Sequence, residues 1–148
     1  MIAVVQRVIS ASVDVPEANH TASINEGLVV LLAVEPDDTD ETAAWISHKL
    51  AHLRVMADDQ GRMNQSILDT GGQLLLVSQF TLAGDCHKGH RPSFVGAANP
   101  ELGQRLYETV AEALSKNHGI TTRTGVFGAS MQVSLVNDGP VTLILRNP

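Results

Sequence analysis

The sequence predicts an α+β fold, a single domain over residues 1–148 in which two main helices cover a curved or barrel-like β-sheet. Most apolar residues fall in short runs rich in Val, Ile and Leu that are bounded by turns, a pattern typical of strands. Only two segments place apolar residues at helical spacing over several turns. Hydrophobic residues make up 43% of the chain and charged residues 18%, a composition that indicates a globular domain and excludes a disordered one.

The first part of the chain predicts three strands. Residues 2–15 are rich in Val and Ile with partial alternation, which indicates a long or bent strand. Residues 20–24 are placed to pair back with it as a hairpin. After Gly27, residues 28–34 form a short, continuous apolar run, which indicates a strand covered on both faces.

A first helix is expected to begin within residues 37–40. Asp38 and Glu41 have the spacing of a capping box, with Asp in place of the usual Ser or Thr. The buried stripe of this helix is predicted from its apolar residues at helical spacing: Ala43, Ile46, Leu50 and Leu53. Residues 54–56 then indicate a return to strand, and residues 58–61 a turn that ends it.

The middle of the chain predicts another buried strand and the second helix. Residues 74–77 form a fully apolar run, and residues 81–98 are loop-like. Asn99 is a good N-cap, Pro100 suits the first helical position, and Gly119 can end the helix. The buried face of this helix is predicted from leucines and a valine four residues apart: Leu102, Leu106, Val110 and Leu114.

Three closing strands are expected at residues 121–126, 131–136 and 141–146. The sequence Asn-Asp-Gly-Pro at residues 137–140 predicts a turn between the last two of them.

Composition narrows the setting in which the protein works. No apolar run approaches the length of a membrane helix, and the N-terminal residues lack the pattern of a signal peptide, so we expect a cytoplasmic protein without membrane contact. The single cysteine, Cys86, excludes an internal disulfide. The net charge of −6 argues against a nucleic-acid partner, but the acidic residues concentrate in the first 60 positions, and residues 87–91 form a basic loop.

Ser78, Gln79, Phe80 and Thr81 follow a buried strand and enter a loop that contains glycine. A strand end is a rigid place from which backbone N–H groups and short hydroxyls face a substrate, although polar residues also mark the end of any core strand. A serine-hydrolase site with Ser78 as nucleophile and His87 or His90 as base is disfavoured. Leu76 and Phe80 occupy the positions where the nucleophile elbow needs glycine.

The sequence predicts no metal site. Cys86, His87 and His90 fall short of a closed zinc site, because the chain has no second cysteine. His48 and His52 are four residues apart, but Glu is not at the second position of this spacing, so they are expected on the polar side of the first helix.

Gly139-Pro140 is the second candidate segment. A Gly-Pro pair in a tight turn can accept a cis peptide bond and hold neighbouring carbonyl oxygens in a fixed direction, toward an ammonium group. The alternative is an ordinary hairpin turn, and the cis state cannot be read from the sequence.

Considered together, these segments resemble those of the D-aminoacyl-tRNA deacylase family. The resemblance rests on four motifs in order: Gln6-Arg7-Val8, Ser78-Gln79-Phe80-Thr81-Leu82, Arg91-Pro92-Ser93-Phe94, and the run from Met131-Gln132-Val133-Ser134 to Gly139-Pro140-Val141-Thr142. A Gly61-x-Met63-Asn64 turn adds to it, and the match covers nearly the whole chain.

The resemblance implies hydrolysis of the ester that joins a D-amino acid to the 3′ end of tRNA, and removal of glycine from mischarged tRNA. It also implies a homodimer in which a cis Gly139-Pro140 pair enters the partner's active site and rejects L-amino acids. Thr81 would be the hydroxyl nearest the ester, and Arg7 would brace the Gly-Pro turn. Met131 is also placed at the substrate, and no cofactor is implied.

From the chemistry of the residues, carbonyls at Gly139 and Pro140 are expected to hold the α-ammonium group, and N–H groups near Gln79 and Phe80 the ester oxygen. Phosphate contacts are expected from Lys88, His90 and Arg91. The phenylalanines Phe80, Phe94 and Phe127 either stack on bases or belong to the core.

Thr81 has no evident general base, so we favour hydrolysis assisted by the 2′-OH of the terminal ribose, with Thr81 positioning the substrate or water. Two alternatives stay open at this point. One is an aminoacyl-tRNA-binding module without turnover, and the other is a small-ester hydrolase that depends on Ser78.

Overall fold

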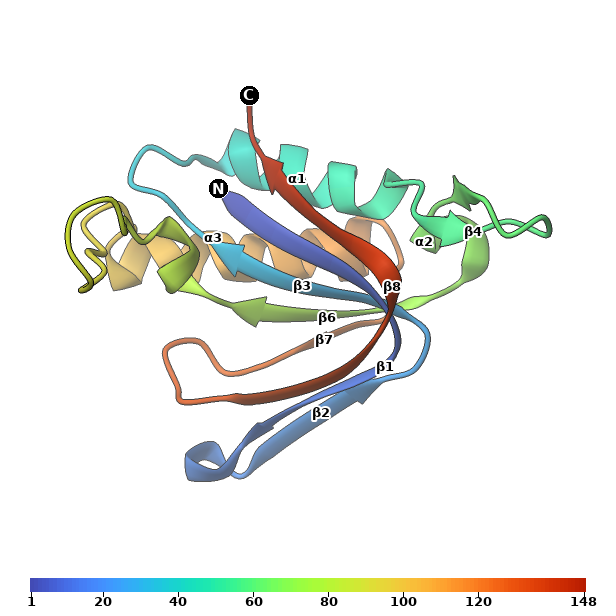
Figure 1. Cartoon of the computed structure of the whole chain (residues 1–148), viewed down its shortest axis with the longest axis horizontal. Coiled ribbons are helices and arrows are strands. Elements are labelled where there is room, and N and C mark those ends of the chain that lie inside the picture. The colour runs from blue at the N-terminus through green and yellow to red at the C-terminus, as the bar shows by residue number, and fades with distance from the viewer.

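The computed structural model describes residues 1–148 and consists of a strongly curved sheet with helices on one face (Figure 1). Five strands follow the order β2-β1-β3-β6-β7, and β8 pairs with the other edge of β1. The strands of this sheet are β1 Ile2–Val15, β2 His20–Ile24, β3 Gly27–Ala33, β6 Gln73–Ser78, β7 Thr122–Thr124 and β8 Gln132–Arg146. The predicted α+β domain with a curved sheet is confirmed.

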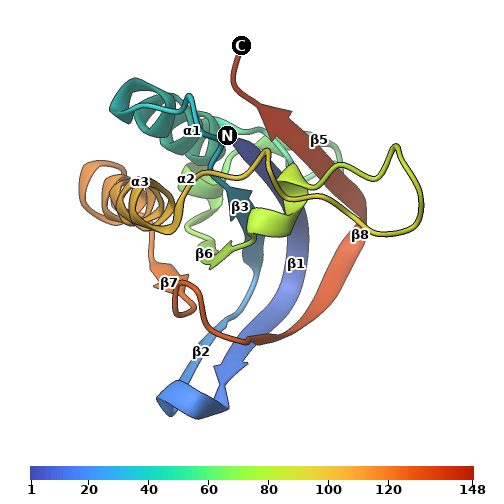
Figure 2. The same ribbon diagram turned by 90° about the vertical axis from the view of Figure 1, so that its left-hand side faces the viewer.

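The long strand β1 organises the sheet. Its first half pairs with β3 and its second half with β2, while β8 runs antiparallel along the whole of its other edge. Figure 2 shows β1 and β8 bending together, so that the sheet curls toward a barrel. β3, β6 and β7 are parallel neighbours, which places the carboxyl end of β6 at one rim of the sheet.

The two main helices, α1 Asp40–His52 and α3 Pro100–Glu112, lie side by side on one face (Figure 1). The principal core lies between them and the sheet and includes Leu50, Leu74 and Leu106. A second, smaller core occupies the inside of the curl and includes Val29 and Leu75. Because alternate residues of β3 and β6 point into the two cores, both strands are buried on both faces, as predicted for the first of them.

The start of α1 differs from the prediction. Thr39 is the N-cap, and it forms a capping box with Thr42, not Asp38 with Glu41. The carboxylate of Asp38 is buried and accepts a hydrogen bond from the backbone N–H of Glu35 at 2.7 Å, so it stabilises the turn before the helix. The predicted stripe is buried except for Leu53, which caps the carboxyl end.

The helix α3 begins as predicted, because the Asn99 side chain accepts a hydrogen bond from the N–H of Leu102 at 2.9 Å. It continues as a π-helical turn, η3 Ala113–Asn117, before Gly119 with φ +68°. The structure adds one short helix that the sequence analysis missed, α2 Ile67–Thr70, after the small hairpin β4 Met56–Ala57 and β5 Met63–Gln65. The remaining 3-10 turns are η1 Pro16–Ala18 and η2 Phe80–Ala83.

The predicted turn at residues 137–140 is wrong. Residues 132–146 form one strand, and both of its halves pair with β1 in the same direction. Gln6 of β1 pairs with Thr142 and Val8 with Asn137, so residues 138–141 lie opposite Arg7 alone. We refer to them as the 138–141 bulge. Proline has no N–H to donate to a β-ladder, which explains why pairing is interrupted there without a change in strand direction.

No helix of the structure has both the length and the apolar character needed to cross a membrane.

Candidate active site

The segment of residues 78–81 lies where β6 ends and the 3-10 turn η2 begins. The N–H of Gln79 donates to the carbonyl oxygen of Leu32 at 2.8 Å, which extends the pairing with β3 by one residue. Ser78 and Gln79 are half-buried, whereas Phe80 and Thr81 are exposed. The sheet therefore fixes the base of the segment and leaves its end open to solvent.

The free backbone donors of this segment are those of Phe80 and Thr81. Neither N–H donates to a protein acceptor, as expected at the start of a helical turn. We expected the N–H of Gln79 to help bind the ester oxygen. This expectation is corrected, because that N–H already donates to the carbonyl oxygen of Leu32. Two successive free N–H groups beside a hydroxyl can together bind an oxygen that carries developing negative charge.

The Thr81 hydroxyl accepts a hydrogen bond from the side-chain amide of Gln79 at 2.6 Å. No carboxylate or imidazole contacts this hydroxyl, so nothing in the chain removes its proton. Ser78 has no histidine partner either. The ring of His87 is almost fully exposed and binds the carboxylate of Asp85 at 2.6 Å. The nucleophile–base pairs of the serine-hydrolase hypothesis are therefore not assembled in this structure.

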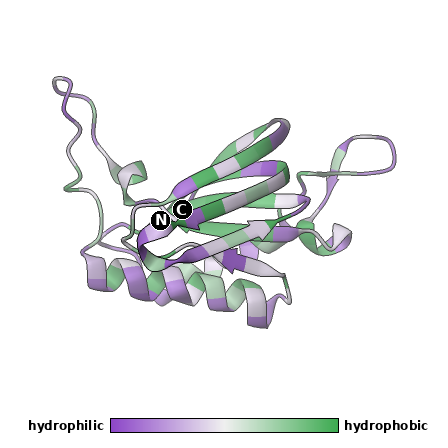
Figure 3. Ribbon diagram, turned by 90° about the horizontal axis from the view of Figure 1, so that it is seen from below, coloured by the Kyte–Doolittle hydropathy of each residue, from purple (hydrophilic) through white to green (hydrophobic).

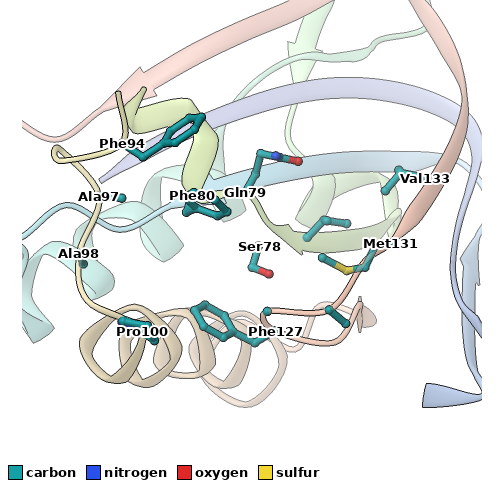
Figure 4. A pocket seen from close by; sticks show the side chains of 13 residues that line it. Ser78, Gln79, Phe80, Phe94, Ala97, Ala98, Pro100, Phe127, Met131 and Val133 are labelled. Carbon is teal, nitrogen blue, oxygen red and sulfur yellow. The ribbon is translucent and has the colours of Figure 1, made fainter. Parts of the chain in front are cut away.

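A cavity of about 540 Å³ adjoins the segment (Figure 4). Ser78 lies between Phe80 and Phe127 in this view, and Met131, which we expected at the substrate, lines another side of the cavity. The rings of Phe80 and Phe94 meet edge to face with centroids 5.3 Å apart, and the two residues are 57% and 38% exposed. These rings are thus available for stacking.

Phe127 is the more enclosed of the three phenylalanines. Its ring packs 5.8 Å from that of Tyr107, which is buried against β6. The sequence analysis missed several small or apolar residues that line the same cavity: Ala97, Ala98, Pro100, Gly128, Ala129 and Val133. Residues of this kind carry no chemical signature, so only the fold reveals that they meet here.

The 138–141 bulge is fixed by hydrogen bonds in both directions across the ladder, and its Gly139–Pro140 peptide bond is cis. The guanidinium of Arg7 donates to the carbonyl oxygen of Asp138 at 3.2 Å and pairs with its carboxylate at 2.8 Å. A second guanidinium nitrogen donates to the carbonyl oxygen of Val55 at 2.7 Å. This geometry agrees with the expectation that Arg7 braces the Gly-Pro segment.

Asn137 holds the bulge from its other side. Its side-chain amide donates to the carbonyl oxygens of Arg7 at 3.0 Å and Val141 at 3.1 Å. A Cβ atom added to Gly139 would lie 2.5 Å from the Asn137 side-chain oxygen, so a side chain at this position would displace the Asn137 amide. The bulge is therefore a rigid, backbone-rich projection on an edge strand.

Within one chain the two candidate segments do not meet. The bulge lies opposite Arg7 of β1. Across the sheet, Arg7 pairs with Leu28 of β3, and Leu28 pairs with Leu74 of β6. The bulge is therefore level with a residue four positions before Ser78. That offset is about 13 Å along the strands, with three strand spacings between β8 and β6 in addition. The bulge also contributes no residue to the cavity beside Ser78.

The loop that carries Lys88, His90 and Arg91 projects from the body of the protein (Figure 2). Its base is closed by reciprocal backbone hydrogen bonds between Asp85 and Ser93, at 2.7 and 2.9 Å. Hydrogen bonds from the backbone and ring of His87 lower the pKa of the Asp85 carboxyl. The three predicted phosphate ligands are thus exposed on a loop that begins at the end of η2.

Apolar side chains are exposed along the edge of the sheet formed by β1 and β8. Ile9, Val136 and Ile144 are 53%, 53% and 67% exposed, and Leu143 is also exposed. Figure 3 shows hydrophobic residues running along the strands. β8 is an edge strand in this single chain, and exposed apolar edges of this kind commonly mark an association surface.

Comparison with known proteins adds to this geometry. The family model described as D-Tyr-tRNA(Tyr) deacylase matches residues 4–146. Proteins named D-aminoacyl-tRNA deacylase from Desulfatibacillum aliphaticivorans and Thermus aquaticus are 54% and 52% identical to this chain. The alignments cover 99% and 98% of this chain and 99% and 94% of those proteins.

Two solved structures have the same fold. One, described as c-Myc DNA Unwinding Element Binding Protein, is 38% identical with a TM-score of 0.91, and the match covers 100% of this chain and 99% of that one. The other, described as a probable eukaryotic D-amino acid tRNA deacylase, is 18% identical with a TM-score of 0.86, and covers 97% of both chains. The similarity to the second structure, at 18% identity, shows only that the fold is shared.

Proposed function

Because the chain belongs to the D-aminoacyl-tRNA deacylase family, we propose that it hydrolyses the ester between a D-amino acid and the 3′ end of tRNA. The observation that carries this proposal is the pair of free N–H groups at Phe80 and Thr81 beside an apolar cavity. An ester carbonyl placed there would receive two hydrogen bonds as its oxygen becomes negative, which is the main requirement for acyl transfer.

The cavity suits the terminal adenosine of the tRNA. Exposed aromatic rings bind unpaired bases by stacking, and Phe80 and Phe94 offer such rings at the entrance. The ester would then lie over η2, with the Thr81 hydroxyl held toward it by Gln79. In this arrangement the base would stack on the rings, the ester would lie over η2, and the amino acid would extend beyond it.

Hydrolysis is assigned to water assisted by the substrate's own 2′-OH. Thr81 has no base to activate it, so it acts as a positioning group. Water adds to the ester carbonyl carbon, the bond from that carbon to the 3′ oxygen breaks, and the 3′ oxygen leaves with a proton. The protein supplies orientation and stabilisation of the oxyanion at Phe80 and Thr81.

Selection of the D form is assigned to Gly139 and Pro140 of a second copy of the chain. The α-ammonium group is two bonds from the ester carbonyl carbon, and the bulge of the same chain is too far away to contact it. Carbonyl oxygens of a partner's bulge would hold the ammonium group and leave an L side chain facing backbone. Glycine attached to tRNA has no side chain that could clash with this backbone, so its ester would also be hydrolysed.

A homodimer is consistent with the exposed apolar edge of β1 and β8. Ile9, Val136 and Ile144 would be covered by the second copy, which also removes an unpaired strand edge. Light scattering tests this association, with Ile144→Asp as the variant expected to give monomers. A monomeric wild-type chain with full D selectivity would contradict the shared site.

Lys88, His90 and Arg91 are assigned to the phosphates near the 3′ end. They lie on an exposed loop that begins directly after η2, and charged side chains at such positions orient a nucleic acid without reading its sequence. Because the substrate is a charged tRNA, we place the reaction in the cytoplasm.

The test is a paired assay with D-Tyr-tRNA and L-Tyr-tRNA, under single-turnover conditions. We expect rapid release of D-tyrosine and little release of L-tyrosine. Equal rates on the two substrates would overturn the selection of the D form. Tight binding of a stable D-aminoacyl-adenosine analogue without ester hydrolysis would instead support a binding module. Loss of all activity in Ser78→Ala, together with unchanged selectivity in Pro140→Ala, would support an ester hydrolase that depends on Ser78.

A further inference from the structure

Three histidines far apart in the sequence meet on the surface of the helical layer. His48 and His52 lie one turn apart on α1, and His118 follows η3. The ring centroids are 4.1 Å apart for His48 and His52, and 5.8 and 5.6 Å from each of these to His118. One ring nitrogen from each residue lies within 4.8 Å of the other two. The sequence analysis considered His48 and His52 but did not predict that His118 joins them.

From this arrangement we propose that His48, His52 and His118 bind a divalent transition-metal ion, with Zn²⁺ as the ion that fits best. Zn²⁺ takes imidazole nitrogens at about 2.0–2.1 Å in tetrahedral geometry, which needs nitrogens about 3.4 Å apart. The three nitrogens are already within 4.8 Å, so small side-chain rotations bring them to that separation. Three imidazoles and one water complete the coordination.

The hydrogen bonding of His52 favours ligation. Its Nδ1 lies 2.9 Å from the backbone carbonyl oxygen of His48, so this nitrogen carries the proton and the other one presents a lone pair. A backbone carbonyl behind the ring is the usual second partner of a metal-ligating histidine. His48 and His52 are exposed, and His118 is half-buried, so an ion can reach all three from solvent.

The charges around the cluster also suit a cation. Ser66 hydrogen bonds, and then Arg54 and His52, lower the pKa of Asp69, so a carboxylate within electrostatic range of His52 stays ionised.

The site would act on stability and not on the hydrolytic reaction. α3 and η3 together span residues 100–117, and Pro100 lines the cavity beside Ser78, so His118 lies about 25 Å from it along the helix. An ion held by two residues of α1 and one after η3 would link the carboxyl ends of both helices.

The experiment is a Zn²⁺ titration of the whole chain by calorimetry at pH 7.5, with any polyhistidine tag removed. We expect one ion per chain, with affinity falling toward pH 5.5 as protons compete for the rings. Loss of a partner behind a ligand costs about 10- to 100-fold in affinity, so loss of a ligand in His118→Gln or His52→Gln should cost at least as much. His87→Gln, an exposed histidine outside the cluster, is the matched control and should bind as wild type does.

Thermal unfolding gives a second measurement, with circular dichroism to confirm that each variant is folded. Zn²⁺ should raise the Tm of the wild type and of His87→Gln, and leave the Tm of His118→Gln unchanged. Absence of saturable binding to the wild type, or equal binding by wild type, His52→Gln and His118→Gln, would overturn the proposal. Loss of binding in His87→Gln alone would place the ion in the loop instead and overturn it as well.

Discussion

Replacing Arg7 by Met tests whether the 138–141 bulge must be held in place. Methionine keeps an unbranched apolar side chain but removes every hydrogen bond that the guanidinium makes. The bond to the carbonyl oxygen of Val55 is at 2.7 Å and largely shielded, since the Arg7 side chain is 13% exposed. Hydrogen bonds from a charged donor contribute about 1.5–3 kcal/mol. The ion pair with Asp138, whose side chain is 48% exposed, adds at most about 1 kcal/mol.

We therefore expect Arg7→Met to lower the free energy of unfolding by about 2–4 kcal/mol in urea titrations. The ratio of D-Tyr-tRNA to L-Tyr-tRNA hydrolysis should fall about tenfold or more, which corresponds to about 1.4 kcal/mol of lost discrimination. Arg7→Lys keeps the charge but not the planar arrangement of donors, so its selectivity should lie between those of Arg7→Met and wild type.

Leu50→Ala is the matched control for stability. Leu50 is fully buried in α1, and removing such a side chain costs about 2–5 kcal/mol. This variant should be destabilised to a similar degree while its D/L ratio stays at the wild-type value. If Arg7→Met is destabilised but keeps the wild-type ratio, Arg7 supports only the fold, and the positioning role that we assign to it is wrong.

Four further expectations follow from the same contacts. Thr81→Ser should keep most of the deacylation rate and Thr81→Ala should lose about 10- to 100-fold, the value of one hydrogen bond; a loss of many thousandfold would indicate a nucleophile. Gly139→Ala should lower both D-Tyr-tRNA hydrolysis and stability, because its Cβ displaces the Asn137 amide; unchanged kinetics would contradict this. Tyr107→Phe should lower the free energy of unfolding by about 0.5–1.5 kcal/mol in urea titration, because the Leu76 carbonyl loses its 2.8 Å hydrogen bond from the hydroxyl and keeps the 3.3 Å bond from the Gly125 N–H. The pKa of His118 is lower in the folded chain than in the unfolded chain, where it is about 6.5. Below pH 6.5 the unfolded chain therefore binds a proton at His118 more readily than the folded chain does. Stability in a chelator should fall as pH drops below 6.5, and the fall should be smaller in His118→Gln.

Elements whose local signals agree with their tertiary surroundings could be predicted from the sequence. Residues 2–15, 28–34 and 74–77 have the composition of strands, and the structure places each in the sheet. α3 was predicted with its N-cap because Asn99 and Pro100 are strong local signals. The start of α1 could not be chosen correctly, because Asp38-Glu41 and Thr39-Thr42 both have capping spacing, and Asp38 is used by the preceding turn.

The last strand shows a limit of local reading. Asn-Asp-Gly-Pro is typical of a hairpin turn, and only pairing with β1 on both sides makes it a bulge. The motif residues of the candidate site could be chosen from the sequence because their chemistry is distinctive. The alanines and the glycine that line its cavity could not be chosen in this way. The three-histidine cluster was missed for the same reason, because it depends on the packing of η3 beside α1.

The pairing of β1 with β8 also affects the order of folding. Ile2 pairs with Arg146, so β1 meets its longest partner only after the other strands of the sheet have been synthesised. Contacts between residues so distant in sequence form late, after local helices and hairpins. During synthesis, β1, β2, β3 and β6 can associate while one edge of β1 stays unpaired and open to other chains. We therefore expect the strand that carries Gly139 and Pro140 to join the sheet last, so that the segment to which we assign chiral selection forms after the segment to which we assign hydrolysis.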